Sequence, residues 1–124
     1  FSMIDVYASF AALLNHELPT GVAPDSRDQL NNFLGTDTIG CDYVVQQNLN
    51  NTLSIIQNNW KYIEPSDKPA LEHWTKMETG NNPQPQLYDL SVDPSEKENL
   101  AGTHPDKVKE LAILLEKVKA AKTK

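Results

Sequence analysis

The sequence predicts an α+β domain: a small antiparallel sheet of three to four strands, covered by a carboxy-terminal helix, with an amino-terminal helix and long loops. Two segments rich in branched and aromatic residues flank an Asn-Asn pair within residues 52–64, a pattern typical of a β-hairpin. The end of the chain has apolar residues at helical spacing. A chain of 124 residues has the size of one domain with one core.

A helix is expected at the amino terminus. Ser2 and Asp5 have the spacing of a capping box, and Leu18-Pro19 ends the helical pattern. The apolar positions repeat on one helical face: Met3, Val6, Tyr7, Phe10, Leu13 and Leu14. A chain that opens on a helix start signal is expected to be cut from a longer protein, and a processed mature protein remains the alternative.

Short elements follow this helix. Residues 19–28 contain clustered Pro, Gly and Asp residues and predict a loop. Residues 28–34 predict a short helix that ends at Gly35, with Leu30, Phe33 and Leu34 directed inward. We therefore expect residues 1–41 to form a helical linker region and residues 42–124 to form the sheet and the last helix.

The strands are expected at residues 42–47, 52–57, 60–64 and 86–90. Asn58-Asn59 tolerates the positive φ of a two-residue turn, so the middle two strands should form an antiparallel hairpin. Trp60 and Tyr62 share one face of their strand, and Trp60 is expected in the core.

Two further segments complete the pattern. Residues 65–85 contain four prolines and predict a long excursion with little regular structure, which is often functional in a compact domain. The final helix is expected over residues 105–121, capped by Thr103 and Asp106.

The chain offers no self-contained catalytic set. Its net charge of -6 disfavours binding to nucleic acid, and no apolar run is long enough to cross a membrane. The lone Cys41 lacks a zinc-binding partner, and the three histidines have no metal-ligand spacing, so no metal site is expected. Arg27 is the single arginine.

Two places could contact a ligand. Trp74 lies in the excursion beside His73 and Lys76, where an indole ring could stack on a sugar. Amides gather at the end of the first expected strand, and they suit the recognition of hydroxyl groups as well as a polar turn: Gln46, Gln47, Asn48, Asn50 and Asn51. By residue type alone, Trp74 is the better candidate for a ligand contact, and the amides remain open between ligand contact and a polar turn.

The segment from Asn59 to Ala101 resembles the carboxy-terminal signature of the sulfatase family. Asn-Trp-Lys-Tyr-Ile at residues 59–63 is followed, after a long gap, by Gln-Leu-Tyr-Asp-Leu at 86–90. An Asp-Pro-Ser-Glu turn at 93–96, Asn-Leu-Ala at 99–101 and a last helix complete the order. Residues 2–7 also resemble the family helix that leads out of the large domain. The resemblance covers nearly the whole chain and extends to arylsulfatases and N-acetylgalactosamine 6-sulfatase-like proteins.

This resemblance implies the carboxy-terminal subdomain of a sulfuric ester hydrolase. In the family, an amino-terminal domain holds a formylglycine, made from Cys or Ser in a Cys/Ser-x-Pro-x-Arg motif, and a bound calcium. That motif is absent here, so the chain alone is expected to be inactive, while its loops are expected to line the substrate cleft. Where relatives often have a histidine in the first strand segment, this chain has Gln46-Gln47-Asn48, which favours hydrogen bonding to a sugar over assistance in catalysis. The resemblance thus makes Gln47, then Gln46 and Asn48, the expected substrate contacts, together with Trp74.

The implied partners are the amino-terminal catalytic domain of the same parent chain and a sulfated sugar. Family habit suggests a periplasmic or extracellular location. We also expect the helix face formed by Met3, Tyr7, Phe10 and Leu14 to be bare in the isolated chain and to drive self-association. The alternatives are a non-catalytic carbohydrate-binding module and a structural interaction module.

Overall fold

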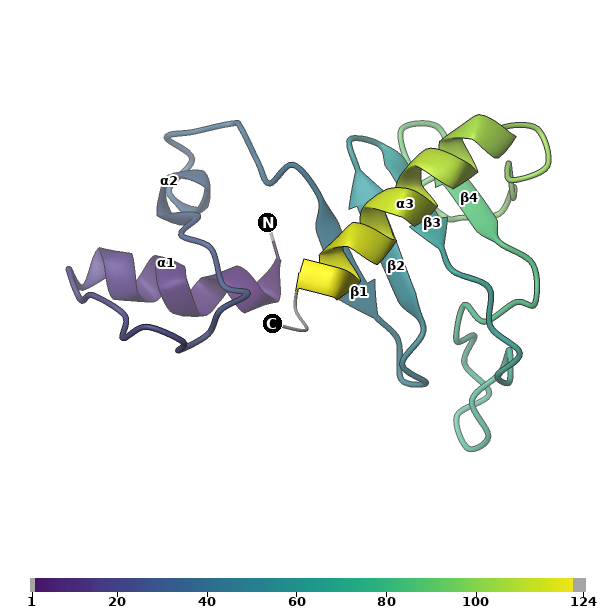
Figure 1. The fold of residues 1–124 in the computed structure, drawn as a ribbon, viewed down its shortest axis with the longest axis horizontal. Helices are drawn as coiled ribbons and strands as arrows, with labels where there is room; N and C mark the ends of the chain where they lie inside the picture. Colours follow the sequence, from purple (N-terminus) through teal and green to yellow (C-terminus); the bar gives the residue numbers. More distant parts are fainter. Residues whose placement is uncertain (1, 122–124) are drawn as a thin grey trace. The chain divides into compact units, whose positions relative to one another are not determined.

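A computed structural model describes residues 2–121 of the chain (Figure 1). The chain divides into two compact units, Phe1–Val44 and Val45–Lys124. Unit 1 contains the helices of the first third of the sequence, and unit 2 contains most of the sheet and the long last helix. The α+β class and the antiparallel sheet of the sequence prediction are confirmed.

Unit 1 is built on the predicted amino-terminal helix. A 3-10 turn, η1 (Met3–Asp5), leads into α1 (Val6–Leu13), and a short α2 (Leu30–Phe33) follows a loop. The Asp5 carboxylate accepts a hydrogen bond from the Ser2 N–H at 3.1 Å, as the capping-box spacing predicts.

The buried side of this helix is polar. Asp5 and Ser9 are 2% and 0% exposed, one helical turn apart. Asp5 Oδ1 accepts from the Arg27 N–H at 3.0 Å, and Ser9 Oγ accepts from the Gln29 N–H at 2.9 Å. The Ala8 N–H donates to Ser26 Oγ at 2.9 Å. These bonds attach the loop before α2 to the helix through polar groups.

The apolar residues of unit 1 lie on its outside. We call Met3, Tyr7, Phe10 and Leu14 the apolar stripe, and each is more than half exposed. The prediction that Phe33 and Leu34 point inward is wrong, since both are exposed. Phe33 instead lies against Phe10, with ring centroids 6.2 Å apart. The two aromatic rings pack on one another at the surface and leave the interior of unit 1 to Asp5 and Ser9.

The sheet has four strands in the order β1-β2-β3-β4. They are β1 (Val44–Gln47), β2 (Leu53–Gln57), β3 (Trp60–Ile63) and β4 (Gln86–Asp89). The predicted hairpin is confirmed, because β2 pairs antiparallel with β3 and Gln57 lies opposite Trp60. Asn58 takes a φ of 53°, a conformation that asparagine tolerates better than most residues.

The last helix covers one face of the sheet (Figure 1). This helix, α3 (Pro105–Ala121), spans the predicted residues and contacts β2 and β3. The register places Ile55, Tyr62 and Leu87 side by side on the same sheet face, and all three are buried. Leu111 and Leu115 of α3 are also buried, so the apolar core of unit 2 lies between the helix and this face.

Trp60 is not in that core, contrary to the prediction. It is half-buried at the start of β3, where its ring lies 5.3 Å from the ring of His104, just before α3. Because the indole packs on His104 at the first position of the strand, it lies outside the fully buried core.

The opposite sheet face mixes polar and apolar side chains. Lys61 forms an ion pair with Glu96 at 2.7 Å, and the Tyr88 hydroxyl donates to Gln86 Oε1 at 2.8 Å. Ile63 is buried on this face beside Gly80 of the 65–85 excursion. A Cβ added to Gly80 would lie 3.9 Å from Ile63 Cδ1, so the two residues are in van der Waals range. The excursion therefore starts and ends at the sheet and packs on the face that α3 leaves uncovered.

Candidate functional site

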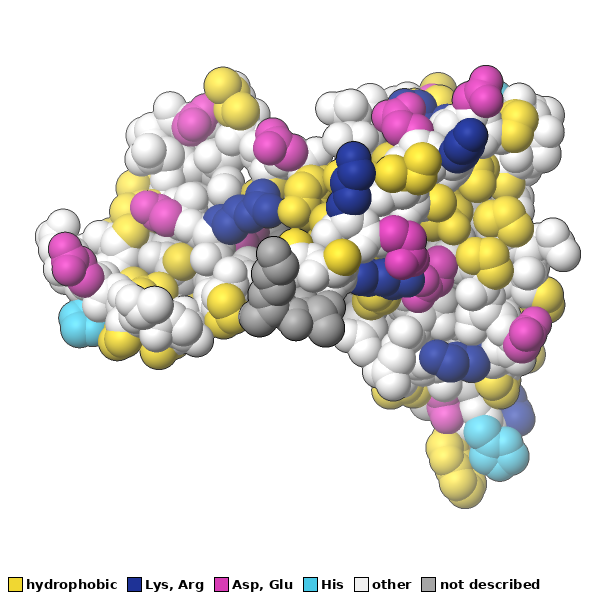
Figure 2. Space-filling view, in the orientation of Figure 1, with side chains coloured by type: hydrophobic (Ala, Val, Ile, Leu, Met, Phe, Trp, Pro, Cys, Tyr) yellow, Lys and Arg dark blue, Asp and Glu magenta, His cyan; other side chains and the backbone are white. Residues whose placement is uncertain are grey.

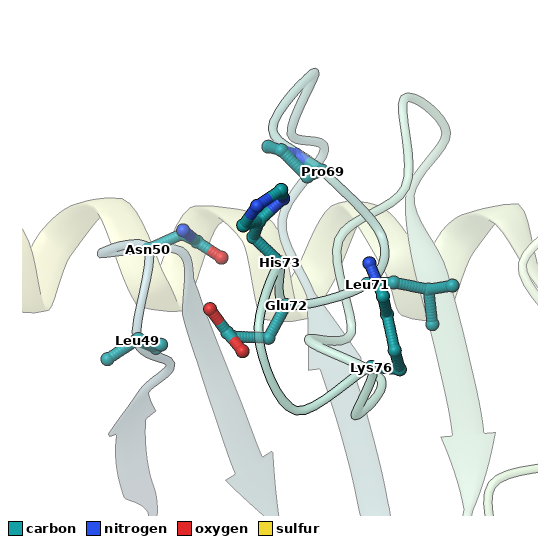
Figure 3. Close-up of a pocket in the computed structure, with 7 residues that line it drawn as sticks. All are labelled: Leu49, Asn50, Pro69, Leu71, Glu72, His73 and Lys76. Carbon is teal, nitrogen blue, oxygen red and sulfur yellow. The ribbon is translucent and has the colours of Figure 1, made fainter.

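Two loops of unit 2 line a cavity of about 310 Å³ that is open to solvent. One is the β1–β2 loop, residues 48–52, and the other is the 65–85 excursion. We call this hollow the loop cavity. Its walls come from both loops: Leu49, Asn50, Pro69, Leu71, Glu72, His73 and Lys76 (Figure 3). Its volume is at the lower end of the range found for small-molecule sites.

A buried asparagine holds the two loops together. Asn81 is 5% exposed, and its Nδ2 donates to Asn50 Oδ1 at 3.0 Å and to the Pro69 carbonyl at 2.9 Å. Its Oδ1 accepts from Asn48 Nδ2 at 2.9 Å and from Thr52 Oγ1 at 2.7 Å. One amide thereby connects the β1–β2 loop to both ends of the excursion.

Asn48 supports the same connection from the other loop. Its Nδ2 also donates to the Thr79 carbonyl at 2.8 Å, and its Oδ1 accepts from the N–H groups of Asn50 and Thr52, each at 2.9 Å. Lys68 donates to the Asn50 carbonyl. Because buried amides with satisfied hydrogen bonds resist rearrangement, these contacts fix the spacing of the cavity walls.

The tip of the excursion is a tight loop closed by a bridge between Leu71 and Glu78. The Glu72 carboxylate lies inside it and accepts from the N–H groups of Trp74 at 2.7 Å and Thr75 at 2.6 Å. The hydrogen bond from the Thr75 backbone is the largest cause that lowers the pKa of Glu72 below its usual value. Glu72 therefore stays ionised at neutral pH and serves as an internal brace.

The same loop presents one lysine, a histidine and apolar groups. Lys76 has a φ of 58°, uncommon for a residue other than glycine, and its N–H donates to the Glu72 carbonyl at 3.1 Å. The His73 ring lies edge-on to Trp74, with centroids 4.8 Å apart, and the Trp74 side chain is 85% exposed. Figure 2 shows hydrophobic and histidine side chains together at this tip of unit 2.

Figure 3 shows how the polar groups lie. The Asn50 amide, the His73 ring and the Glu72 carboxylate turn toward the gap between the loops. Leu49, Pro69 and Leu71 add apolar surface to the same walls. Neighbouring apolar and hydrogen-bonding surfaces suit a ligand with both hydroxyl groups and C–H faces.

The structure places the sequence-predicted binding residues around this site in different ways. Gln46 and Gln47 are exposed at the end of β1, and Gln47 Nε2 donates to Asn51 Oδ1 at 2.5 Å. Asn48 is occupied by the hydrogen bonds that connect the loops. Trp74 stands at the rim, next to His73. Direct contact of these four residues with a substrate stays a prediction.

Sequence reasoning did not place Asn50, His73 and Lys76 together in one cavity wall. Asn50 comes from the β1–β2 loop and lies 23 or more positions before His73 and Lys76, which come from the excursion. No periodic pattern connects the three residues. The sequence carries no signal that joins them, because Asn81-Asn82 is one of several Asn-Asn pairs in the chain.

Other chemistry is sparse in the part of the chain that the structure describes. Between residues 2 and 121, no three His, Cys, Asp or Glu side chains gather into a metal site. Over the same residues, no helix is both long enough and apolar enough to span a membrane. Arg27 and Cys41 serve unit 1: the guanidinium donates to the Tyr43 hydroxyl at 3.1 Å, and the Cys41 thiol lies 3.7 Å from Asp5 Oδ2.

Comparison with curated proteins gives two relatives, whereas no protein-family model matches the chain. The chain is 62% identical over 119 residues to an N-acetylgalactosamine-6-O-sulfatase of Bacteroides thetaiotaomicron, which covers 96% of the chain and 23% of that protein. It is 38% identical over 60 residues to arylsulfatase K of Xenopus laevis, across 48% of the chain and 9% of the relative. The chain thus spans less than a quarter of the length of each relative, and in the first it matches a carboxy-terminal part.

Solved structures agree with the sequence comparison. One, from work on the metabolism of multiple glycosaminoglycans by Bacteroides thetaiotaomicron, superposes with a TM-score of 0.91 at 62% identity, over 97% of this chain and 25% of that one. Ps i-CgsB, solved alone and in complex with k-i-k-neocarrahexaose, has a TM-score of 0.61 at 20% identity and shares the fold. In sequence and in fold, this chain is a carboxy-terminal subdomain of the sulfatase family.

Proposed function

We propose that the chain completes the fold of a sulfuric ester hydrolase and lines part of its substrate cleft. The observation that carries this proposal is the 62% identity to the Bacteroides sulfatase along 96% of the chain. Identity at that level extends over both units, so the role of this region in the relative is the best guide to its role here. The parent protein would then be a sulfatase of which this chain supplies about the last quarter.

The catalytic chemistry is proposed to lie in an amino-terminal domain of the parent. Sulfate ester cleavage needs a strong nucleophile and cations that stabilise the oxyanions of the transition state. The single arginine, Arg27, is used in unit 1, and the described residues do not fit a calcium site. Formylglycine and calcium, which the family implies, would therefore belong to the amino-terminal domain.

The substrate is proposed to be a sulfated sugar, and the location periplasmic or extracellular. The name of the Bacteroides relative points to sulfated N-acetylgalactosamine as its own substrate. Gln46 and Gln47 lie exposed at the end of β1 and offer amide groups for sugar hydroxyls. They remain our proposed substrate contacts, together with Asn48 and Trp74.

The apolar stripe of unit 1 is the proposed contact with the amino-terminal domain. Met3 and Leu14 are 80% and 76% exposed, and Tyr7 and Phe10 lie between them on the same helix face. Burying such side chains stabilises a contact by roughly 1.5–3 kcal/mol each. In the isolated chain the same stripe would drive self-association.

A chimera tests the proposed function. The carboxy-terminal segment of the Bacteroides sulfatase is replaced by residues 1–124 of this chain, and sulfate release from N-acetylgalactosamine 6-sulfate is measured. The chimera is expected to keep activity within about tenfold of the relative. Because this chain and the replaced segment share a fold, the same contacts should hold the catalytic groups in position. A soluble, folded chimera that releases no sulfate would overturn the proposal.

Two controls accompany this measurement. The 124-residue chain alone should release no sulfate from an aryl sulfate, with or without added calcium. In the chimera, Phe10→Ser together with Leu14→Ser should impair assembly or activity, whereas Ile113→Ser on α3 should not. Ile113 is a matched control because it is 47% exposed, close to the 53% of Phe10.

A further inference from the structure

We propose that the loop cavity binds one acidic sugar unit of the glycan, as a subsite separate from the unit whose sulfate is cleaved. This inference rests on the proposed function, because it assigns the substrate of that function to a particular place. It adds the residues that would hold the unit: Asn50, His73 and Lys76, with Trp74 at the rim.

The size and lining of the loop cavity favour a single sugar ring. Its volume of about 310 Å³ is adequate for one monosaccharide, but not for several enclosed units. Leu49 and Leu71 offer apolar surface for the C–H faces of a ring, while the Asn50 amide faces the gap and suits hydroxyl groups (Figure 3).

The charge of Lys76 at the cavity favours an acidic unit. Lys76 lines the walls together with the His73 ring, which can donate a hydrogen bond, and within residues 2–121 no ion pair forms on the Lys76 ammonium. The one acidic lining residue, Glu72, is already engaged by three donors from Trp74 and Thr75. A sulfate or carboxylate of the ligand would therefore meet the unpaired charge of Lys76. The negative charge of Glu72 is already balanced by hydrogen bonds within its own loop.

The rigidity of the walls favours binding. Asn81 and Asn48 hold the two loops in place through hydrogen bonds of 2.7–3.0 Å. Glu72 fixes the loop that carries His73 and Lys76. A preorganised site loses less conformational entropy when it binds a ligand.

Trp74 extends the site beyond the cavity. Its indole is 85% exposed and contacts the His73 ring, so a second sugar could stack on it while the first occupies the cavity. Trp60 offers a built-in control, because it is half-buried against His104 on another part of unit 2.

The test is a titration of the 124-residue chain, labelled with nitrogen-15, with three tetrasaccharides. They are chondroitin 6-sulfate, desulfated chondroitin, which keeps its carboxylates, and neutral chitotetraose. We expect the indole N–H signal of Trp74 to shift with both acidic sugars, while that of Trp60 stays in place. The sulfated and desulfated arms reveal whether the sulfate or the carboxylate is the group recognised.

Variants localise the binding. His73→Ala and Lys76→Ala should each raise the dissociation constant for the acidic tetrasaccharides roughly three- to tenfold, and added salt should raise it further. Lys109→Ala, an exposed position on α3, should leave it unchanged. Three results would overturn the subsite. The three variants could lose affinity equally, chitotetraose could bind as well as the acidic sugars, or the indole N–H signal of Trp74 could stay in place in a folded chain.

The chimera gives a second measurement that does not depend on the isolated chain. There, His73→Ala and Lys76→Ala should raise KM for the sulfated tetrasaccharide roughly three- to tenfold and leave kcat and KM for the monosaccharide unchanged. Unchanged KM for both substrates in an active chimera would reject the subsite and keep the proposed function. Tetrasaccharide binding by the chain beside a folded but inactive chimera would reject the function alone.

Discussion

The two units of this chain place their apolar residues in opposite ways. In unit 2, Ile55, Leu87 and Leu111 are completely buried between the sheet and α3. In unit 1, the buried helix positions are Asp5 and Ser9, and the apolar stripe faces outward. The same chain therefore contains one part with an ordinary hydrophobic core and one part organised around hydrogen bonds.

Unit 2 has the stronger source of stability of its own. Burial of apolar surface is the dominant favourable term in folding, and unit 2 has it. Unit 1 instead depends on hydrogen bonds from loop N–H groups to Asp5 and Ser9, each of which contributes only about 1 kcal/mol net. Large exposed apolar patches usually mark an interface, so unit 1 has the surface chemistry of a connecting element.

The largest effect is expected in the core of unit 2. Leu87→Ala should lower the free energy of unfolding by roughly 2–5 kcal/mol, because it leaves a cavity between the sheet and α3. Urea unfolding followed by circular dichroism measures the loss. Ile113→Ala on the outer side of α3 should cost well under half as much, and similar losses at the two positions would contradict the core as described.

The second effect concerns the polar interior of unit 1. Ser9→Ala should destabilise that unit by about 1–3 kcal/mol, since the Gln29 N–H and the Asp5 carbonyl both lose their partner. Hydrogen exchange at Ala8 and Gln29 should accelerate, whereas amides of β2 and β3 should not change. Ser95→Ala, at an exposed position, is the control; acceleration across both units would show that they unfold as one.

A smaller effect is expected at high pH in unit 2. Hydrogen bonds to Glu116 and Glu64 raise the pKa of Lys119, and burial, followed by the charge of Glu64, raises the pKa of Tyr62. Both groups hold their protons longer in the folded state, so their stabilisation is complete below the unfolded pKa values and is lost as pH rises through the folded ones.

We therefore expect the stability of unit 2 to fall above about pH 10. The contribution of Lys119 should be at most about 1 kcal/mol, because its ion pairs are partly exposed to solvent. Urea unfolding at neutral and alkaline pH measures it. Lys119→Gln should flatten the decline and Lys109→Gln should not; an unchanged decline in Lys119→Gln would show that the ion pairs contribute nothing.

The smallest effect on stability is expected at the apolar stripe. Phe10→Ser with Leu14→Ser should change the free energy of unfolding of the monomer by only about 0.5 kcal/mol, as for surface positions in general. The apparent mass in light scattering should nevertheless fall to 13.9 kDa, because self-association is lost. A native chain that is already monomeric, or a double variant that unfolds, would contradict the comparison between the units.

The sequence predicted some residues of the candidate site but not the contacts that hold it together. The amide run at residues 46–51 and Trp74 stood out by residue type. Asn50 of that run lines the loop cavity, and the Trp74 ring contacts the lining residue His73. The role of Asn81 did not stand out, because a buried amide that connects two loops has the same sequence signature as one in an exposed turn. Only its four contacts in the folded chain distinguish the two cases.

Local sequence patterns specify the helices and strands of this protein. Alternating branched residues around Asn58 specify the β2–β3 hairpin, and helical spacing after Pro105 specifies α3, because both depend on interactions between near neighbours. The order of segments from Asn59 to Ala101 also pointed to the sulfatase family. The tertiary structure decided which faces are buried: it turned Asp5 and Ser9 inward and left Phe33 and Leu34 outside. Those outcomes depend on long-range packing and on hydrogen bonds between distant loops, which no local pattern encodes.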